Sequence, residues 1–270
     1  MSAEYALPMT SDLWVHIMTD PRGPGATMDV YEQDWLNIQT QHIPELTQNA
    51  TLGRQWLLQM NEGAEVTGKH IQMCMSLTRH ILQSLEMSQV SQARASHDYT
   101  AAPAIQWTVG LSGMLASAVG IAPSKDNAWS QTHQPLANNT YHDSRTEPRF
   151  RLQSAVMTLS RGPVAFSNQI GLSNKTVIMH TCRSDGMLLR PDRPATLINQ
   201  IINNRAFQNA PSKLPDGEVW STTSSIQGLR FAHLISTDLS DAISVKPSDM
   251  ELGDGRGPLP APTKGWVAFE

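Results

Sequence analysis

Hydrophobic and polar positions alternate with two different periods along residues 28–175. Short stretches rich in strand-forming residues occur at 28–36, 71–75, 88–93, 121–129 and 162–167. Between them, apolar residues recur at helical spacing, as Leu52, Trp56 and Met60 do in the first case. The expected helices lie at 51–65, 78–85, 104–119 and 148–159. Short strands alternating with helices of roughly 10–15 residues predict an α/β fold with βαβ units and a parallel sheet.

This pattern changes at both ends of the region. The first 27 residues contain Pro21, Gly23, Pro24 and Gly25, so an irregular segment is expected there. Beyond residue 176, short apolar stretches are separated by turn signals, and no long helix is expected. Those stretches lie at 177–180, 187–189, 217–221, 229–236, 242–245 and 265–270. The predicted layout is an irregular segment at 1–27, an α/β domain at 28–175 and an antiparallel all-β domain, a β-sandwich, at 176–270.

Composition and charge exclude several classes of protein. The 270 residues are 40% hydrophobic and only 16% charged, so a disordered chain is excluded. The formal net charge is −4 and no basic run is present, which argues against nucleic acid as a partner. The longest apolar-leaning stretch, 110–123, is too short and too rich in serine and glycine to span a bilayer. We therefore expect neither a nucleic-acid nor a membrane partner.

Cysteines and sequons bear on the cellular compartment. Cys74 and Cys182 are too few for a disulfide scaffold and lack metal-ligand spacing, and Cys74 is expected to be a buried, inert thiol. Three N-glycosylation sequons begin at Asn49, Asn138 and Asn174 and favour a secreted or lysosomal protein. No secretory signal is visible at the N-terminus, so the localisation stays open.

Polar residues end each expected strand of the α/β region. They are Asp34, Ser76, Asp98, Asp126 and the pair at 167–168. Ligands of α/β proteins bind at the carboxyl ends of parallel strands, so these residues predict a composite site. Two acids facing one pocket meet the requirement for glycoside cleavage, and a retaining enzyme needs their carboxyl groups roughly 5–5.5 Å apart. The strand-end acids Asp34, Asp98 and Asp126 are the candidates for such a pair.

Other side chains would assist these two acids. Arg94 would bind a sugar hydroxyl and hold one acid ionised, whereas Trp35 and Trp129 would stack on the sugar ring. Asp126 and Ser76 complete the candidate substrate-binding set. No phosphate loop, dinucleotide fingerprint, nucleophile elbow or zinc motif is found, and no cofactor or metal is implied.

Each assignment has a structural alternative. A strand-terminal acid such as Asp34 is often a helix N-cap. Arg94 and Asp98, four residues apart, are a typical structural ion pair, and Asp126 equally suits a solvated loop. His80 and His97 have no partner at metal spacing, so packing or loop hydrogen bonding is favoured for both.

Taken in order, four segments resemble the raffinose synthase and alkaline α-galactosidase group of the α-galactosidase clan. They are 73–76 (MCMS), 94–99 (RASHDY), 123–129 (PSKDNAW) and 162–167 (GPVAFS). The resemblance spans about residues 28–200, and it also includes the segment 184–190 (SDGMLLR), which is similar to the start of that group's C-terminal β domain.

This resemblance implies the C-terminal portion of a (β/α)8 barrel, about strands 4–8, followed by a β domain. Asp34 would match the nucleophile ending the fourth strand, and Asp98 the general acid/base after the sixth. Arg94 would be the sugar-binding arginine, with Asp126 and Trp129 on the loop of the seventh strand. The chain departs from the group at Glu32, where a lysine is usual, and at Asn168, where an aspartate is usual.

The expected function is therefore a retaining glycosidase, or a transferase using the same mechanism, acting on α-linked, α-galactoside-like hexosides. The expected partner is a carbohydrate, and the oligomeric state is left open. With strands 1–3 outside the chain, we expect a fragment whose sheet has open edges and wet hydrophobic faces. Two alternatives are a non-catalytic carbohydrate-binding relative and a metal-dependent, aldolase-type barrel enzyme.

Overall fold

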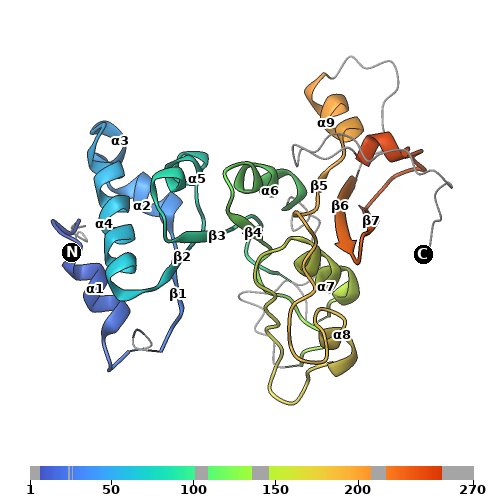
Figure 1. The fold of residues 1–270 in the computed structure, drawn as a ribbon, viewed down its shortest axis with the longest axis horizontal. Coiled ribbons are helices and arrows are strands. Elements are labelled where there is room, and N and C mark those ends of the chain that lie inside the picture. The colour runs from blue at the N-terminus through green and yellow to red at the C-terminus, as the bar shows by residue number, and fades with distance from the viewer. Residues whose placement is uncertain are drawn as a thin grey trace.

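The computed structural model describes residues 7–23, 25, 27–100, 109–135, 146–207 and 217–250. Within these residues the chain forms a four-stranded parallel sheet with helices and a separate three-stranded antiparallel sheet (Figure 1). The mixed α/β class predicted from the hydrophobic pattern is confirmed at this level.

The parallel sheet has the strand order β1-β2-β3-β4, which is also the order along the chain. Its strands are β1 (Val30–Gln33), β2 (His70–Met73), β3 (Val90–Arg94) and β4 (Ala122–Ser124). The connections contain α2 (Leu36–His42), α3 (Glu45–Gln48), α4 (Leu52–Thr67), α5 (Thr78–Gln83), η2 (Ser84–Glu86) and α6 (Val109–Ala118). Each pair of consecutive parallel strands is joined by a helical crossover, as expected of βαβ units. A parallel bridge between Ala128 and Phe166 continues the order beyond β4.

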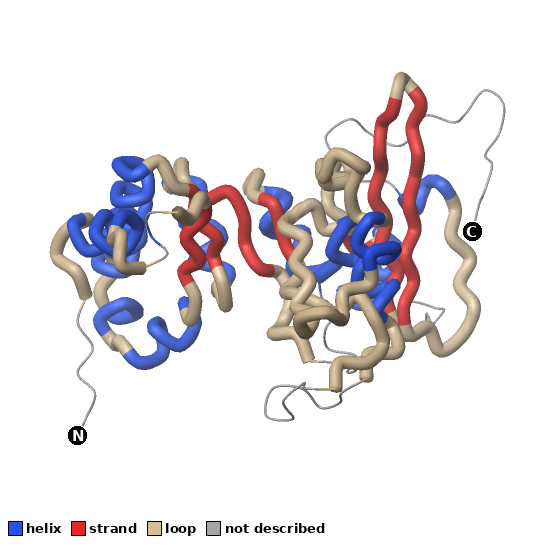
Figure 2. Tube along the Cα trace, turned by 90° about the horizontal axis from the view of Figure 1, so that it is seen from below, coloured by secondary structure: helices blue, strands red, loops and turns tan. Residues whose placement is uncertain are grey.

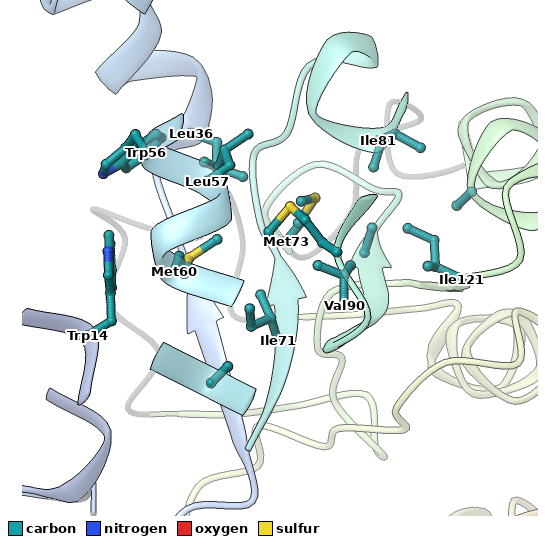
Figure 3. Packing of buried hydrophobic residues seen from close by; sticks show 14 of the residues in the cluster. Trp14, Leu36, Trp56, Leu57, Met60, Ile71, Met73, Ile81, Val90 and Ile121 are labelled. Carbon is teal, nitrogen blue, oxygen red and sulfur yellow. The ribbon is translucent and has the colours of Figure 1, made fainter. Parts of the chain in front are cut away.

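Hydrophobic side chains fill the space between the parallel sheet and its helices. Leu57 and Met60 of α4 lie against Ile71 and Met73 of β2, and all four are at most 3% exposed (Figure 3). Gly68, with φ 68°, ends α4 in the left-handed conformation that glycine adopts without strain. The predicted helix over 51–65 and the predicted strand over 71–75 are thus confirmed, and their contact forms the main core.

The expectation of an irregular N-terminal segment is wrong for residues 12–19. These residues form α1 (Asp12–Thr19), whose Trp14 and Met18 are buried against α4. A β-carbon on Gly63 of α4 would lie 2.5 Å from the β-carbon of Trp14, so the two helices are in close contact. With only eight residues, α1 shows too few apolar repeats to be recognised, and its burial depends on α4.

The two faces of the parallel sheet differ in chemistry. The helix-covered face carries Ile71, Met73, Val90 and Ala93, all of which are buried. The opposite face is polar and is exposed or half-buried at Glu32, His70, Gln72 and Gln92. A closed barrel has bulky aliphatic side chains on this inner face. The expected wet hydrophobic face is therefore wrong, since the open face of the sheet is hydrophilic.

Helices and strands are mixed in the C-terminal part of the chain. The elements are α7 (Phe150–Leu159), α8 (Lys175–Met179), β5 (Thr196–Leu197), α9 (Asn199–Ala206), β6 (Glu218–Ile226), β7 (Leu229–Thr237) and η4 (Pro247–Met250). The antiparallel sheet has the order β5-β6-β7, and Figure 2 shows β6 and β7 as one long hairpin. The two strands predicted at 217–221 and 229–236 are confirmed, and β6 extends five residues further.

Several expectations for this region are wrong. Residues 177–180, expected to be a strand, belong largely to α8, because Asn174 caps that helix by accepting a hydrogen bond from the backbone N–H of Val177. Helix α9 was not expected, since it buries little beyond Ile201 and has a weak apolar pattern. Residues 242–245 form no strand, and residues 187–189 contribute a single bridge at Leu188. The described residues contain one antiparallel sheet instead of a sandwich, and the strand expected at 265–270 lies outside them.

The antiparallel sheet packs on α6 of the parallel part. Trp220 of β6 is 1% exposed and lies against Gly110 of α6, where a β-carbon would come within 2.7 Å of three indole atoms. Around this contact lies a second core that includes Val109, Val156 and Ile198. In the part of the chain that the structure describes, no helix combines the length and apolar character needed to cross a bilayer.

Candidate functional site

The first two parallel strands end in the same backbone conformation. Two residues after β1 stands Trp35 with φ 62°, and two residues after β2 stands Met75 with φ 47°. Positive φ is strained for bulky side chains and is concentrated at functional sites. The two loops are joined by a 3.0 Å hydrogen bond from the backbone N–H of Asn37 to the carbonyl of Met75. Trp35 is 54% exposed directly beside Asp34.

A row of side chains crosses the carboxyl edge of the sheet. Gln33 pairs with Met73, which in turn pairs with Ala93, so the next residues, Asp34, Cys74 and Arg94, follow one another across three strands. Cys74 in the middle is fully buried. Burial raises the pKa of its thiol, and the carboxylates of Asp34 and Glu32 raise it further, whereas the charge of Arg94 opposes them. Asp34 and Arg94 thus act on one thiol from opposite sides.

Arg94 joins this row to the two remaining acids. Its guanidinium Nη1 lies 2.6 Å from Asp98 and 3.6 Å from Asp126, and its side chain is only 9% exposed. The structural ion pair considered for Arg94 and Asp98 is therefore present. Within the described residues, the buried Nε of Arg94 has no hydrogen-bond partner.

Asp126 fastens the loop after β3 to the loop after β4. Its Oδ2 accepts a 2.6 Å hydrogen bond from the backbone N–H of Tyr99, and its own N–H donates to Ser96 Oγ at 2.8 Å. In these contacts the carboxylate of Asp126 holds two loops together. This is the structural role in a loop that was the alternative to substrate binding. Trp129 is 2% exposed and packs edge-on against Tyr99, with ring centroids 5.8 Å apart. It presents no open face to a sugar, which corrects the expectation of stacking by Trp129.

Beneath these loops lies a buried polar cluster that sequence reasoning missed. Tyr99 donates from its hydroxyl to Glu147 Oε2 at 2.9 Å, and Glu147 is 1% exposed. Lys125 is 3% exposed, with Nζ 4.9 Å from the centre of the Tyr99 ring and 3.1 Å from the carbonyl oxygen of Asn127. Burial lowers the pKa of Lys125 to about 8. Lys125 and Glu147 are far apart in the sequence, and no local pattern predicts that they lie close together in the fold.

The two histidines considered as ligands behave differently. His80 is 1% exposed, and its Nδ1 accepts a 3.0 Å hydrogen bond from the backbone N–H of Leu77. Burial, followed by the charge of Arg79, lowers the pKa of His80 to about 4, so the ring is neutral and structural. His97 is exposed at the edge of the pocket described next. Over the ranges that the structure describes, no three His, Cys, Asp or Glu side chains are grouped as metal ligands.

A pocket of about 700 Å³ opens at the carboxyl end of β3, between α5 and α6. Ser76, Arg94 and Asp98 line it, so three of the predicted site residues share one cavity. Its volume is typical of a small-molecule site. Asp34, Trp35, Asp126 and Trp129 are not among its lining residues.

The assembled site is an acidic edge around the buried guanidinium of Arg94. It offers carboxylates on both sides of β2, an exposed indole, and a cavity next to Asp98. Such groups suit the recognition of a neutral, hydroxyl-rich ligand and the transfer of protons to and from it. No protein-family model and no curated protein matches this chain.

Proposed function

We propose that this protein is a retaining glycosidase, or a transglycosidase using the same mechanism, that acts on α-linked, α-galactoside-like hexosides. The resemblance of its strand-end segments to raffinose synthases and alkaline α-galactosidases supports the substrate class. The consecutive parallel strand order supports the corresponding partial barrel, of which β1 to β4 would be strands 4 to 7.

One observation carries the proposal: Asp34 and Asp98 lie at the same edge of the sheet and are linked through Cys74 and Arg94. Asp34 follows β1 and Asp98 follows β3, with only β2 between them. Neighbouring strands are about 4.8 Å apart, so β1 and β3 are separated by roughly 10 Å, and Asp98 lies in the loop that follows β3. The proposal requires the two carboxylates to come within the range of separations that glycosidases use.

The proposed reaction has two steps. The carboxylate of Asp34 forms a bond to the anomeric carbon while Asp98 protonates the glycosidic oxygen, and the C–O bond to the leaving alcohol breaks. Water then attacks the glycosyl–enzyme ester and transfers its proton to Asp98, which releases the sugar and restores both acids. Arg94 orients Asp98, and Trp35 offers its exposed face to the sugar ring.

The test is hydrolysis of aryl α-hexosides by the wild-type chain and by Asp34→Asn. We expect the variant to lose about 10⁴-fold in kcat while still binding sugar. Formate or azide, which replaces the missing nucleophile, is expected to restore part of the activity. Asp29→Asn is the matched control, since Asp29 is exposed at the opposite end of β1. Equal activity of Asp34→Asn and wild type would refute the assignment.

A carbohydrate-binding protein without turnover is the second candidate. The 2.6 Å contact between Arg94 and Asp98 favours it, because this carboxylate must give up a buried cation before it can donate a proton. Sugar binding with no hydrolysis by the wild-type chain is the result that this candidate predicts. The metal-dependent alternative has no ligand cluster to support it in the described part of the chain.

A further inference from the structure

The pocket beside Asp98 is divided into a polar and an apolar part. Ser76, Arg94 and Asp98 follow the parallel strands, whereas other lining residues belong to α5 and α6. These two helices are neighbours in Figure 1. The aliphatic lining residues at and next to these helices are Leu77, Ile81, Leu111, Leu115 and Ala116, and Thr78 and Ser112 also line the pocket. The cavity is therefore amphiphilic, with its charged groups at one end.

Helix α6 presents two different sides to the rest of the molecule. Gly110 and Gly113 lie against Trp220 and Pro123, where the helix is in close contact with its neighbours. Leu111 and Leu115, four residues apart, line the pocket instead. Leu111 is 52% exposed, although it belongs to a helix with ample buried contacts elsewhere. A large apolar side chain exposed at the edge of a cavity is typical of a ligand-binding wall.

A second sugar ring is a poor occupant for this wall. Sugar hydroxyls need hydrogen-bond partners, and burying them against aliphatic side chains leaves them unpaired, which is unfavourable. Sugars also bind to aromatic faces, and the described residues that line the pocket include no Trp, Tyr or Phe. An alkyl or aryl group, in contrast, gains free energy from every methylene that it buries there.

We propose that this pocket binds an apolar aglycone, so that the substrates are alkyl or aryl hexosides rather than oligosaccharides. The inference rests on the proposed glycosidase function, because it assigns the cavity to the group that leaves with the proton of Asp98. That proton passes to the glycosidic oxygen as its bond to the anomeric carbon breaks, and the alcohol released is an alkanol or phenol. The buried Nε of Arg94 is a donor for the sugar end of such a ligand.

The experiment measures binding directly, so that it does not depend on turnover. Octyl α-galactoside and methyl α-galactoside are titrated calorimetrically into the full chain, at concentrations where the octyl compound is monomeric. We expect the octyl compound to bind about tenfold tighter or more. Leu111→Asp is expected to abolish this preference. Leu82→Asp, which changes a leucine of α5 that is 49% exposed and does not line the pocket, is expected to keep it.

The possible outcomes distinguish the proposed aglycone site from the proposed glycosidase function. Equal affinities for the two compounds, no binding of either, or a preference that survives Leu111→Asp would overturn the proposed aglycone site. Hydrolysis of galactosides without an octyl preference would support the glycosidase function and refute the assignment of the pocket to an apolar aglycone. The wild-type chain could instead prefer the octyl compound, lose that preference in Leu111→Asp and hydrolyse no hexoside. This result would support a binding site for amphiphiles in the pocket and refute the glycosidase function.

Discussion

Two glycines on α6 offer a stringent test of how the two sheets are joined. In Gly110→Ala the new β-carbon falls within 2.7 Å of three atoms of the Trp220 indole. That ring cannot easily move, because it is 1% exposed and its Nε1 donates to Glu218 Oε2 at 2.5 Å. In Gly113→Ala the nearest atoms are Cβ and Cγ of Pro123 at 3.4 Å, an ordinary contact. The same substitution, three residues apart, is therefore expected to act in opposite directions.

The magnitudes follow from these distances. Overpacking at Gly110 costs about 1–3 kcal/mol, and displacement of the buried indole places the expected loss near the upper end. Gly113→Ala has no such cost and gains up to about 1 kcal/mol from helix propensity. Urea unfolding followed by far-ultraviolet circular dichroism should separate the two variants by about 2–4 kcal/mol. Equal stabilities would refute the packing of β6 on α6. In the double variant Gly110→Ala with Trp220→Phe, the loss of unfolding free energy should be smaller than the sum of the losses in the two single variants.

Three further predictions concern buried charges. The pKa of His80 falls from 6.5 to about 4 in the folded state, so the unfolded chain binds more protons than the folded chain between these pH values. Stability should therefore decline by about 3 kcal/mol as pH falls from 6.5 to 4, and His80→Gln should flatten this part of the pH profile of urea unfolding. The pKa of Lys125 falls from 10.5 to about 8, so stability should rise as pH increases from 8 to 10.5, and Lys125→Met should remove that rise in the same measurement. Arg94→Met should cost about 2–4 kcal/mol of unfolding free energy, because Asp126 is left partly buried without its cation. Arg94→Lys keeps a positive charge and should cost less. Equal losses in the two variants would contradict the role of the charge.

Local patterns identified the elements that carry strong periodicity. The helix around Trp56 and Met60, the strands that end near Asp34 and Cys74, and the strands predicted at 217–221 and 229–236 were all predictable, because each is defined by residues close in sequence. The polar positions at strand ends were equally visible. Since the carboxyl ends of parallel strands share one edge, their gathering followed from the predicted topology.

Short helices were missed because their stability comes from distant partners. Helix α1 depends on the contact of Trp14 with α4, and α9 buries little beyond Ile201. The segment at 177–180 reads as a strand in its composition, yet Asn174 caps it as a helix. In each case tertiary contacts or a cap outweigh a weak local preference.

The sequence by itself determined the alternation of strands and helices, the parallel pairing of the first sheet and the acidic character of its carboxyl edge. Only the tertiary structure decided what those acids touch: Arg94 is shared by Asp98 and Asp126, Cys74 lies between Asp34 and Arg94, and Trp129 is buried. The physical reason is the distance along the chain over which each effect acts. Periodicity and turn chemistry act over a few residues, whereas burial, ion pairing and pKa shifts depend on segments that are brought together only when the sheet and its helices pack.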